Sequence, residues 1–385
     1  MTITTISREA YRTALALPDL TDAANGPHAL QQLVQAAIQS LATAWGCEVL
    51  VHRAHALVSV EDNYERLLYP PEAAARDARY TRYLTPSHVL RTHTTAMIPS
   101  LLRMLAPAPY EDVLLACPGL VYRRDSIDRL HLGELHQLDL WRIAACPLDT
   151  RDLLSMVDVV VGALVPGAEH RALPASHPYT ENGLEVEVSV DGRWIELLEC
   201  GLAAPRILEE AGLPPDHYRG LAMGVGLDRA LMLHKGVDDI RLLRSRDARV
   251  AAQMCDLRPY RRVSTMPPVA RDLSVAVAAD ATPEELGDCV REALGERADS
   301  VESVEVLAET PIDELPPQAV ERIGIRPGHK NVLVRVVLRH PTRTLTAREA
   351  NELRDEVYAA IHEGAAGEWA CDVPPARLGT RSGAS

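Results

Sequence analysis

Phenylalanine is absent from this sequence of 385 residues, and lysine occurs only at positions 235 and 330. A GC-rich genome explains the scarcity of lysine, since arginine is abundant in its place. The same codon bias does not explain the absence of phenylalanine, because tyrosine, whose codons lean the same way, occurs 11 times. We interpret the gap as selection against phenylalanine itself.

Two further absences narrow the class of protein. No apolar run reaches the roughly 18 residues of a membrane-spanning helix, and the opening MTITTISREA lacks the basic and apolar blocks of a signal peptide. The seven cysteines are scattered and form no CxxC pair, so the sequence predicts free thiols in a reducing cytoplasm and no structural metal site. We therefore expect a cytoplasmic protein without a membrane partner.

The charge balance is acidic, with 54 Asp and Glu against 40 Lys and Arg. The net charge of −14 argues against general affinity for nucleic acid, which depends on neutralising phosphates. One group of basic residues nevertheless falls close together: Arg322, Arg326, Lys330, Arg335, Arg339 and Arg343. This basic run is either a positive face for nucleic acid or a solvated sheet edge.

The hydrophobic pattern predicts mixed helices and strands. Residues 28–45 and 151–164 carry apolar residues at helical spacing, and 87–106 also looks helical, opened by Ser87 or Thr94. Two β-hairpins are expected, one over 119–146 and one over 183–200 around an Asp-Gly turn.

The pattern also divides the chain. A composition break at LRPYRRVSTMPP indicates a linker, and the β-α-β-β-α order beyond it is typical of a ferredoxin-like domain. In its last helix Thr346 and Glu349 form a predicted capping box. We therefore expect an α+β protein with these parts: a larger domain over 1–256, a linker over 257–268, a smaller domain over 269–365 and a disordered tail over 366–385.

One charged hairpin, VYRRDSIDRLHLGELHQLDLWRIA, carries the chemistry. Arg123 offers a rigid fork of donors that matches phosphate oxygens, and with His131 across the turn it can hold two phosphates of a bent nucleotide. Asp125 can accept from an adenine amino group. Gln137 and Asp139 alternate on one strand face, where an amide and a carboxylate suit the ammonium of an amino acid. A solvated charged hairpin is the alternative interpretation.

A second segment, GLAMGVGLDRALML, favours the first interpretation. Its glycines at 220, 224 and 226 let a strand pass close to a flat ligand before Arg229 opens a helix, although tight strand–helix packing would also explain them. An arginine on a hairpin strand, followed much later by a glycine-rich strand that leads into a second arginine, is more specific. The combination resembles the antiparallel-sheet ATP site of class II aminoacyl-tRNA synthetases.

Within that class the sequence resembles the phenylalanyl-tRNA synthetases. VYRRDSIDRLHLGELHQLD is similar to the family's second motif, and GLAMGVGLDRALMLHKGVDDIRLLRSRDARV is similar to its third. RTHTTA, NYERLLYPPEAAARD, and HPYTENGLEVEV followed by WIELLECGL resemble further family segments. PPVARDLSVAV and RTLTAREANELRDEVY resemble the ferredoxin-fold anticodon-binding domain, and the fusion of both parts resembles the single-chain organellar enzyme. The similarity covers roughly residues 28–365 in family order.

This resemblance implies a class II synthetase antiparallel sheet flanked by helices, plus the smaller ferredoxin-like α+β domain. It also implies ATP-dependent activation of phenylalanine or a Phe-like amino acid as the aminoacyl-adenylate, with Mg²⁺, and transfer to tRNA. Such a ligase would be cytoplasmic and either a monomer or a homodimer.

The resemblance also implies roles for particular residues. The residues that would bind ATP are Arg123, Asp125, His131, Leu135 and Arg229. Three of them, Arg123, His131 and Arg229, would be catalytic. The amino-acid-binding group is Thr95, Gln137, Asp139, His177, Tyr179, Thr180 and Ala222.

Several departures from the family fall where it has phenylalanine. Leu135 stands where a phenylalanine stacks on adenine, Leu221 and Met223 replace two in the third motif, and His177 and Tyr179 stand where an F-P-F pair clasps the substrate ring. Our hypothesis is that a synthetase without phenylalanine can be translated when charged tRNA-Phe is scarce.

Other departures concern polarity at the amino-acid pocket. Ile98 replaces a glutamine that helps bind the amino acid in the family, and Glu199 replaces a glycine beside Cys200. A carboxylate at position 199 can project into the pocket and, with His177 and Tyr179, make it more polar than phenylalanine requires. These changes bear on the identity of the substrate more than on adenylate formation.

Two other functions stay open from the sequence. One is a paralogue that adenylates another amino acid for a non-tRNA acceptor in specialised metabolism, and the other is a regulatory or binding protein that kept the fold without catalysis. Retention of Arg123, His131, Gln137 and Arg229 argues against the latter.

Overall fold

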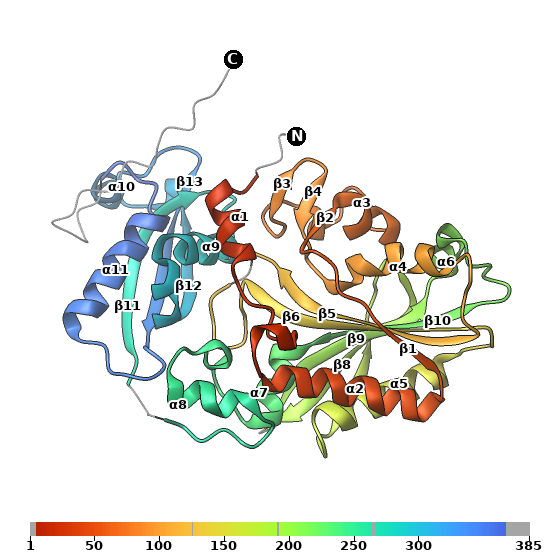
Figure 1. The fold of residues 1–385 in the computed structure, drawn as a ribbon. Coiled ribbons are helices and arrows are strands. Elements are labelled where there is room, and N and C mark those ends of the chain that lie inside the picture. The colour runs from red at the N-terminus through yellow and green to blue at the C-terminus, as the bar shows by residue number, and fades with distance from the viewer. Residues whose placement is uncertain (1–4, 125, 191, 264–266, 367–385) are drawn as a thin grey trace. The chain divides into compact units, whose positions relative to one another are not determined.

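The computed structural model describes residues 5–124, 126–190, 192–263 and 267–366 (Figure 1). The chain groups into two compact units. The first unit comprises 1–123 and 133–261, and the second comprises 124–132 together with the chain from 262 onward. The tip of the charged hairpin thus belongs to the C-terminal unit, whereas its two strands belong to the first.

A seven-stranded sheet forms the centre of the first unit, in the order β1-β5-β6-β10-β9-β8-β7. Only β1 and β5 run parallel, and every other neighbouring pair is antiparallel. The antiparallel sheet expected for this fold class is therefore confirmed. Its strands are β1 (Glu48–Val51), β5 (Asp112–Tyr122), β6 (Glu134–Ala144), β7 (His170–Pro174), β8 (Thr180–Val190), β9 (Arg193–Ala203) and β10 (Arg219–Gly226).

Both predicted hairpins are present. Strands β5 and β6 pair along their whole length, from Asp112 opposite Ala144 to Tyr122 opposite Glu134. Strands β8 and β9 form the second hairpin. Asp191 of the predicted Asp-Gly turn lies outside the described residues, and Gly192 has φ +75°, the left-handed conformation that such a turn requires.

Helices cover both faces of this sheet (Figure 1). On one face α2 packs against α5 and α7, and the helices predicted over 28–45 and 151–164 are confirmed as α2 and α5. On the other face α4 and α6 share a buried core with the sheet residue Trp141. The helices of the unit are α1 (Arg8–Leu15), α2 (Ala29–Trp45), α3 (Val60–Asn63), α4 (Ile98–Leu105), α5 (Thr150–Leu164), α6 (Pro205–Ala211), α7 (Leu227–Lys235) and α8 (Ala248–Ala251).

Of the two helix starts expected within 87–106, Ser87 is wrong, and Thr94 opens the 3₁₀ turn that leads into the helix. The first half of this range contains β4 (His88–Leu90), which lies between β2 (Leu57–Ser59) and β3 (Tyr83–Thr85) in a small sheet, followed by a 3₁₀ turn at Thr94–Met97. The buried guanidinium of Arg91 explains the difference, because it donates to the carbonyls of Leu120 and Ala54 and holds the segment against β5. The helix begins only at α4, with proline in its first turn.

The second unit contains a three-stranded sheet in the order β11-β13-β12. The capping box at Thr346 and Glu349 is confirmed, since each backbone N–H bonds to the other residue's side chain at 2.8 and 3.2 Å. The predicted β-α-β-β-α order is present, with α10 as an additional short helix. The elements are β11 (Val269–Ala278), α9 (Pro283–Leu294), β12 (Val301–Pro311), α10 (Pro317–Ile323), β13 (His329–Leu338) and α11 (Ala347–Ile361).

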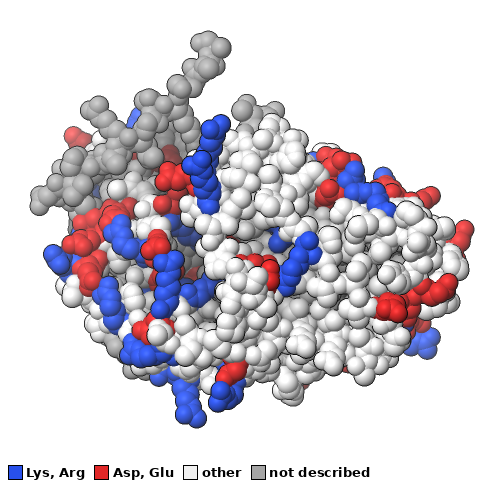
Figure 2. Space-filling model, in the orientation of Figure 1, with Lys and Arg blue, Asp and Glu red and all other residues white. Residues whose placement is uncertain are grey.

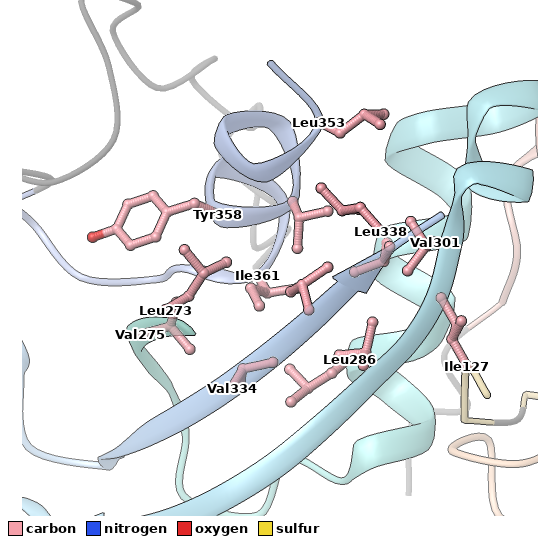
Figure 3. Close-up of a cluster of buried hydrophobic side chains, with 14 of the residues drawn as sticks. Ile127, Leu273, Val275, Leu286, Val301, Val334, Leu338, Leu353, Tyr358 and Ile361 are labelled. Carbon is pink, nitrogen blue, oxygen red and sulfur yellow. The ribbon is translucent and has the colours of Figure 1, made fainter. Parts of the chain in front are cut away.

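The hairpin tip is built into the core of this second unit. Ile127 is 6% exposed and packs with Leu286, Val301 and Val334 in one hydrophobic cluster (Figure 3). The backbone N–H of Val304 donates to the Ile127 carbonyl at 2.9 Å. Further polar contacts surround it: Arg291 donates to the Ser126 carbonyl at 2.6 Å, and Arg129 pairs with Glu302 at 2.9 Å.

Parts of two sequence predictions lie outside the described residues, namely 264–266 of the linker and the tail from 367 onward. Of the helices that the structure describes, none combines the length and the apolar character needed to cross a membrane.

Candidate functional site

The site begins with a row of residues across the large sheet. Asp139 on β6 lies opposite Gly224 on β10, and Gly224 lies opposite Glu199 on β9, so all three face the same side. A side chain built on Gly224 would meet nothing closer than Asp139 Oδ2, at 3.9 Å. The glycine therefore leaves an open floor with one carboxylate on each side. Two strand spacings, about 9–10 Å, separate the backbones of these carboxylates.

Asp139 anchors one end of this floor. It is 2% exposed and accepts hydrogen bonds from Thr94 Oγ1 at 2.6 Å and from Trp141 Nε1 at 3.2 Å, and the Thr95 hydroxyl also bonds to it. The Thr94 backbone N–H donates to Gln137 Oε1 at 3.3 Å. The structure thus brings together Thr95, Gln137 and Asp139, and it adds Thr94, which sequence reasoning missed although RTHTTA pointed to this segment.

The electrostatics at Asp139 favour a cationic ligand. Burial raises the pKa of Asp139 to about 6, and the hydrogen bonds from Thr94, Thr95 and Trp141 oppose that rise only in part. An ammonium group brought next to the carboxylate would stabilise its charged form and lower this pKa again. The arrangement therefore suits the α-ammonium of an amino acid.

Arg123 lies at the end of β5 and faces the same space. Its Nε donates to the Thr92 carbonyl at 2.7 Å, and its backbone N–H donates to the Gly133 carbonyl at 2.8 Å, so the guanidinium is held at a fixed position. Its charge lowers the pKa of Asp139 and of His93. An anionic group of a ligand would find its counter-charge here.

His93 is a site residue that sequence reasoning missed. Burial, reinforced by Arg123, lowers the pKa of His93 to about 3, so its ring is neutral at physiological pH. Both ring nitrogens are buried and make no hydrogen bond of normal geometry within the described residues. The ring stacks on Tyr69, with centroids 5.8 Å apart. Unpaired buried nitrogens of this kind fit a site that is completed by a polar ligand.

Stacked aromatic rings form one wall of the site. Tyr179 stacks on Trp141 at 6.2 Å and on His177 at 5.8 Å, and it lies 6.2 Å from Tyr69. Burial raises the pKa of both tyrosines, so their hydroxyls stay protonated. The predicted pocket residues His177 and Tyr179 are therefore neighbours, and both are flat and polar.

The remaining predicted pocket residues border this wall. Ala222 is buried opposite Trp141 on the neighbouring strand. Thr180 packs closely on Gly201, since a Cβ atom added at Gly201 would lie 2.6 Å from Thr180 Cβ. His177 Nδ1 lies 3.2 Å from the Thr180 hydroxyl, and His177 Nε2 lies 3.3 Å from Glu199 Oε1.

Two predicted ATP-binding residues lie elsewhere in the same unit. Arg229, in the first turn of α7, donates to the Glu196 carbonyl at 2.9 Å and pairs with the Glu196 carboxylate at 3.3 Å. Leu135 is half-buried on β6 and shares a strand face with Gln137 and Asp139.

The other two predicted ATP-binding residues are Asp125 and His131. Asp125 lies outside the described residues. His131 belongs to the second unit, where its Nδ1 lies 2.7 Å from Asp128 Oδ2 and its backbone N–H donates to Asp128 Oδ1 at 2.9 Å.

A buried histidine–aspartate pair positions the strand that carries Gln137 against the helix that carries Arg229. His136 Nδ1 lies 3.1 Å from both Asp228 oxygens, and its Nε2 accepts from the Leu20 backbone N–H at 3.0 Å. Although burial opposes the shift, His136 lowers the pKa of Asp228 to about 2. The pair therefore fixes the spacing between β6 and α7.

The chain matches two protein families and several relatives of known name. Residues 16–254 match the family described as tRNA synthetases class II core domain (F), and residues 264–368 match the ferredoxin-fold anticodon binding domain. Because the first match covers more than half of the chain, the chain belongs to the class II tRNA synthetases. The predicted fold class is confirmed.

Within this class, the relatives that the chain matches are phenylalanine--tRNA ligase alpha subunits. The chain is 37% identical over 191 residues to the phenylalanine--tRNA ligase alpha subunit of Prochlorococcus marinus strain NATL2A, covering 50% of this chain and 56% of the relative. It is 32% identical over 256 residues to the phenylalanine--tRNA ligase alpha subunit of Oenococcus oeni, covering 63% of this chain and 72% of that relative. The predicted resemblance to phenylalanyl-tRNA synthetases is therefore confirmed, although the chain spans about half the length of the first of these relatives.

A solved pyrrolysyl tRNA synthetase from Desulfitobacterium hafniense is 20% identical, with a TM-score of 0.43 over 56% of this chain and 72% of the other.

Proposed function

We propose that this chain activates phenylalanine or a Phe-like aromatic amino acid with ATP and transfers it to tRNA. The observation that carries the proposal is the buried carboxylate of Asp139, held by Thr94 and Thr95, on the face that also presents Arg123. One end of the site suits an ammonium group and the other suits a phosphate. An amino acid and ATP would meet between them.

In this mechanism Asp139 and Gln137 hold the α-ammonium, and Tyr179 and Ala222 border the side chain. A carboxylate oxygen of the amino acid attacks the α-phosphorus of ATP, which is bound by Arg123. The bond from that phosphorus to the β-phosphate oxygen breaks, and pyrophosphate leaves with the electron pair. A terminal ribose hydroxyl of tRNA then attacks the aminoacyl carbonyl and releases AMP. The chain contributes positioning and fixed positive charge.

The donor set near Arg229 fits the Mg²⁺ that class II synthetases generally use with ATP. Burial raises the pKa of Glu185, and the charges of Glu196, Glu187 and Glu199 raise it further, which indicates carboxylates that gain from a cation. Within the described residues no three metal-ligating side chains form a cluster. Mg²⁺ is commonly held by one or two carboxylates together with phosphate oxygens, and Glu185 and Glu196 would be those carboxylates here. When bound, the ion would neutralise phosphate charge.

The tRNA acceptor is proposed from the match of the second unit to an anticodon-binding domain. The net charge of that unit does not support tRNA binding, because residues 261–365 contain 13 Lys and Arg and 19 Asp and Glu. Figure 2 shows basic and acidic side chains interspersed over its visible face. Within the basic run, four residues pair with carboxylates: Lys330 with Glu309, Arg335 with Asp272, Arg339 with Glu302, and Arg343 with Glu349.

We further propose that the enzyme works in the cytoplasm as a monomer or a homodimer. The support is the fusion of catalytic and anticodon-binding segments in one chain. Light scattering on the purified chain, with and without tRNA, measures the oligomeric state directly. A mass well above two chains would contradict this part of the proposal.

ATP–pyrophosphate exchange across all amino acids tests the proposed activation, followed by charging of tRNA-Phe with each amino acid that exchanges. We expect exchange with an aromatic amino acid and aminoacylated tRNA. Exchange without charging would point to a non-tRNA acceptor. ATP binding without exchange would leave a binding protein that kept the fold.

A further inference from the structure

The amino-acid end of the site contains a polar pair that activation of phenylalanine does not use. His177 Nε2 lies 3.3 Å from Glu199 Oε1, and the side chains are 9% and 46% exposed. The geometry of this contact is poor for a hydrogen bond, so Glu199 satisfies the buried Nε2 only in part. Polar groups that are buried and only partly satisfied favour a ligand that supplies further hydrogen bonds.

The pair lies where the ring of a bound amino acid would end. Asp139 and Glu199 are on opposite sides of Gly224, about 9–10 Å apart between their backbones. This separation is comparable to the length of an aromatic amino acid. With its ammonium at Asp139, the ligand would lie over Gly224 beside the stacked rings of Tyr179 and His177.

The chemistry of the pair calls for a group that both donates and accepts. His177, in contact with Glu199, lowers the pKa of the Glu199 carboxyl, which is therefore an acceptor at physiological pH. His177 Nδ1 lies 3.2 Å from the Thr180 hydroxyl, which can donate to it and so leave the proton on Nε2. A hydroxyl placed between them would donate to Glu199 and accept from His177. An unsubstituted phenyl ring would desolvate both groups and pair with neither.

We propose that the substrate is an aromatic amino acid with a ring hydroxyl, of the tyrosine type, bound at that hydroxyl by Glu199 and His177. The inference rests on the proposed function, because it needs the α-ammonium at Asp139. It assigns Glu199 and His177 as specificity-determining residues for the same reaction.

The test is ATP–pyrophosphate exchange by the full chain with phenylalanine, tyrosine, meta-tyrosine, 3,4-dihydroxyphenylalanine and para-aminophenylalanine. We expect kcat/KM for at least one hydroxylated substrate to exceed that for phenylalanine by about tenfold or more, since sites built to bond a hydroxyl discriminate strongly against its loss. Preference for phenylalanine, or for the amine over every hydroxylated ring, would overturn the inference. Phenylalanine preferred by an active enzyme would leave the proposed function intact. No exchange with any amino acid would instead count against the proposed function.

Two variants separate specificity from folding. Glu199→Gly should lower the ratio of kcat/KM between the preferred hydroxylated substrate and phenylalanine by about tenfold or more, and His177→Phe should shift it in the same direction. The matched control is Glu48→Gly, the same change at an exposed position of β1 in the same sheet, which should leave the ratio unchanged. An unchanged ratio in whichever of the two pocket variants folds would overturn the assignment of these residues.

Discussion

The two units place their charged groups in opposite ways. In the first unit, ionisable groups such as Asp139, His93 and Asp228 are buried at or beside the site, and burial or a fixed partner shifts their pKa values far from the ordinary range. In the second unit Glu302 is also buried, where it pairs with Arg129 and Arg339. Other charges of that unit pair at the surface, as in the contact of Arg335 with Asp272, whose side chains are both 43% exposed. Buried charge is costly and is retained where a ligand compensates it, whereas exposed pairs contribute little to stability or binding. The comparison locates the chemistry in the first unit.

The largest effect is expected at Arg123. Arg123→Ala should lower kcat/KM for pyrophosphate exchange by about 10³-fold, because it removes fixed charge from the transferring phosphate. The matched control is Arg335→Ala in the second unit, which should leave exchange unchanged. A loss smaller than tenfold at Arg123, or an equal loss in both variants, would break the contrast between the units.

The second-largest effect is expected at Ile127, the residue of the hairpin tip that packs in the core of the second unit. Ile127→Ala should cost about 2–4 kcal/mol of the unfolding free energy of the second unit, because it opens a cavity in its core. Hydrogen exchange of the β13 amides measures this loss. Leu307→Ala on β12, a residue 37% exposed, is the control and should change protection little. Unaltered β13 protection in the Ile127 variant would show that the tip contributes nothing to that core.

The carboxylate of Asp139 should lower the stability of the fold at neutral pH and be required for pyrophosphate exchange. Its folded pKa of about 6 lies above the ordinary value of 3.8, so the contribution of Asp139 to stability is full below about pH 4 and is lost as the pH rises through 6. Asp139→Asn removes this titration, and at pH 8 it should be more stable than wild type by up to about 3 kcal/mol while losing exchange activity. Urea unfolding at pH 4, 6 and 8 measures the difference.

Asp272 supplies the control of opposite sign. The hydrogen bond from Arg335 lowers the pKa of Asp272, so its contribution is present above the ordinary pKa and is lost as the pH falls through the folded value. Asp272→Asn should therefore lower stability at neutral pH and leave exchange unchanged. If both asparagine variants shifted stability in the same direction, the assigned electrostatics of Asp139 would be wrong.

The smallest effect is expected from salt. Because the basic run is largely paired with carboxylates, raising salt should weaken tRNA charging only slightly, with a shallow slope of log kcat/KM against log salt. Arg335→Ala should not change that slope. A steep slope that Arg335→Ala reduces would show that the second unit binds tRNA through this basic run, and the contrast between the units would then narrow.

Local patterns predicted most of the elements. Helical spacing located α2 and α5, the Asp-Gly turn located β8 and β9, and a capping box located the start of α11. Ser87 was wrong as a helix start because Arg91 bonds to the carbonyls of Leu120 on β5 and of Ala54 in the loop after β1, and such long-range bonds leave no periodic signal in the sequence.

The site was predictable in kind more than in detail. Motif residues placed Arg123, Gln137 and Asp139 on one hairpin, and the structure keeps them there. Thr94 and His93 were missed because they lie in the same motif, RTHTTA, as Thr95. Only the contacts in the folded chain show which of the three residues lie at the site. The placement of 124–132 in the second unit could not be anticipated either, since Ile127 contacts residues more than 140 positions away in the chain.

By itself, the sequence determined the class of protein, because its motifs resemble those of a known family. It also determined the order of most elements and the residue types available to the site, because these depend on local spacing and composition. Only the tertiary structure decided that Asp139, Gly224 and Glu199 form one row. Strand register fixes which side chains share a face, and a slip of one residue would turn Glu199 to the opposite face. The polar pair from which we infer the substrate exists because β6, β9 and β10 pair in this register.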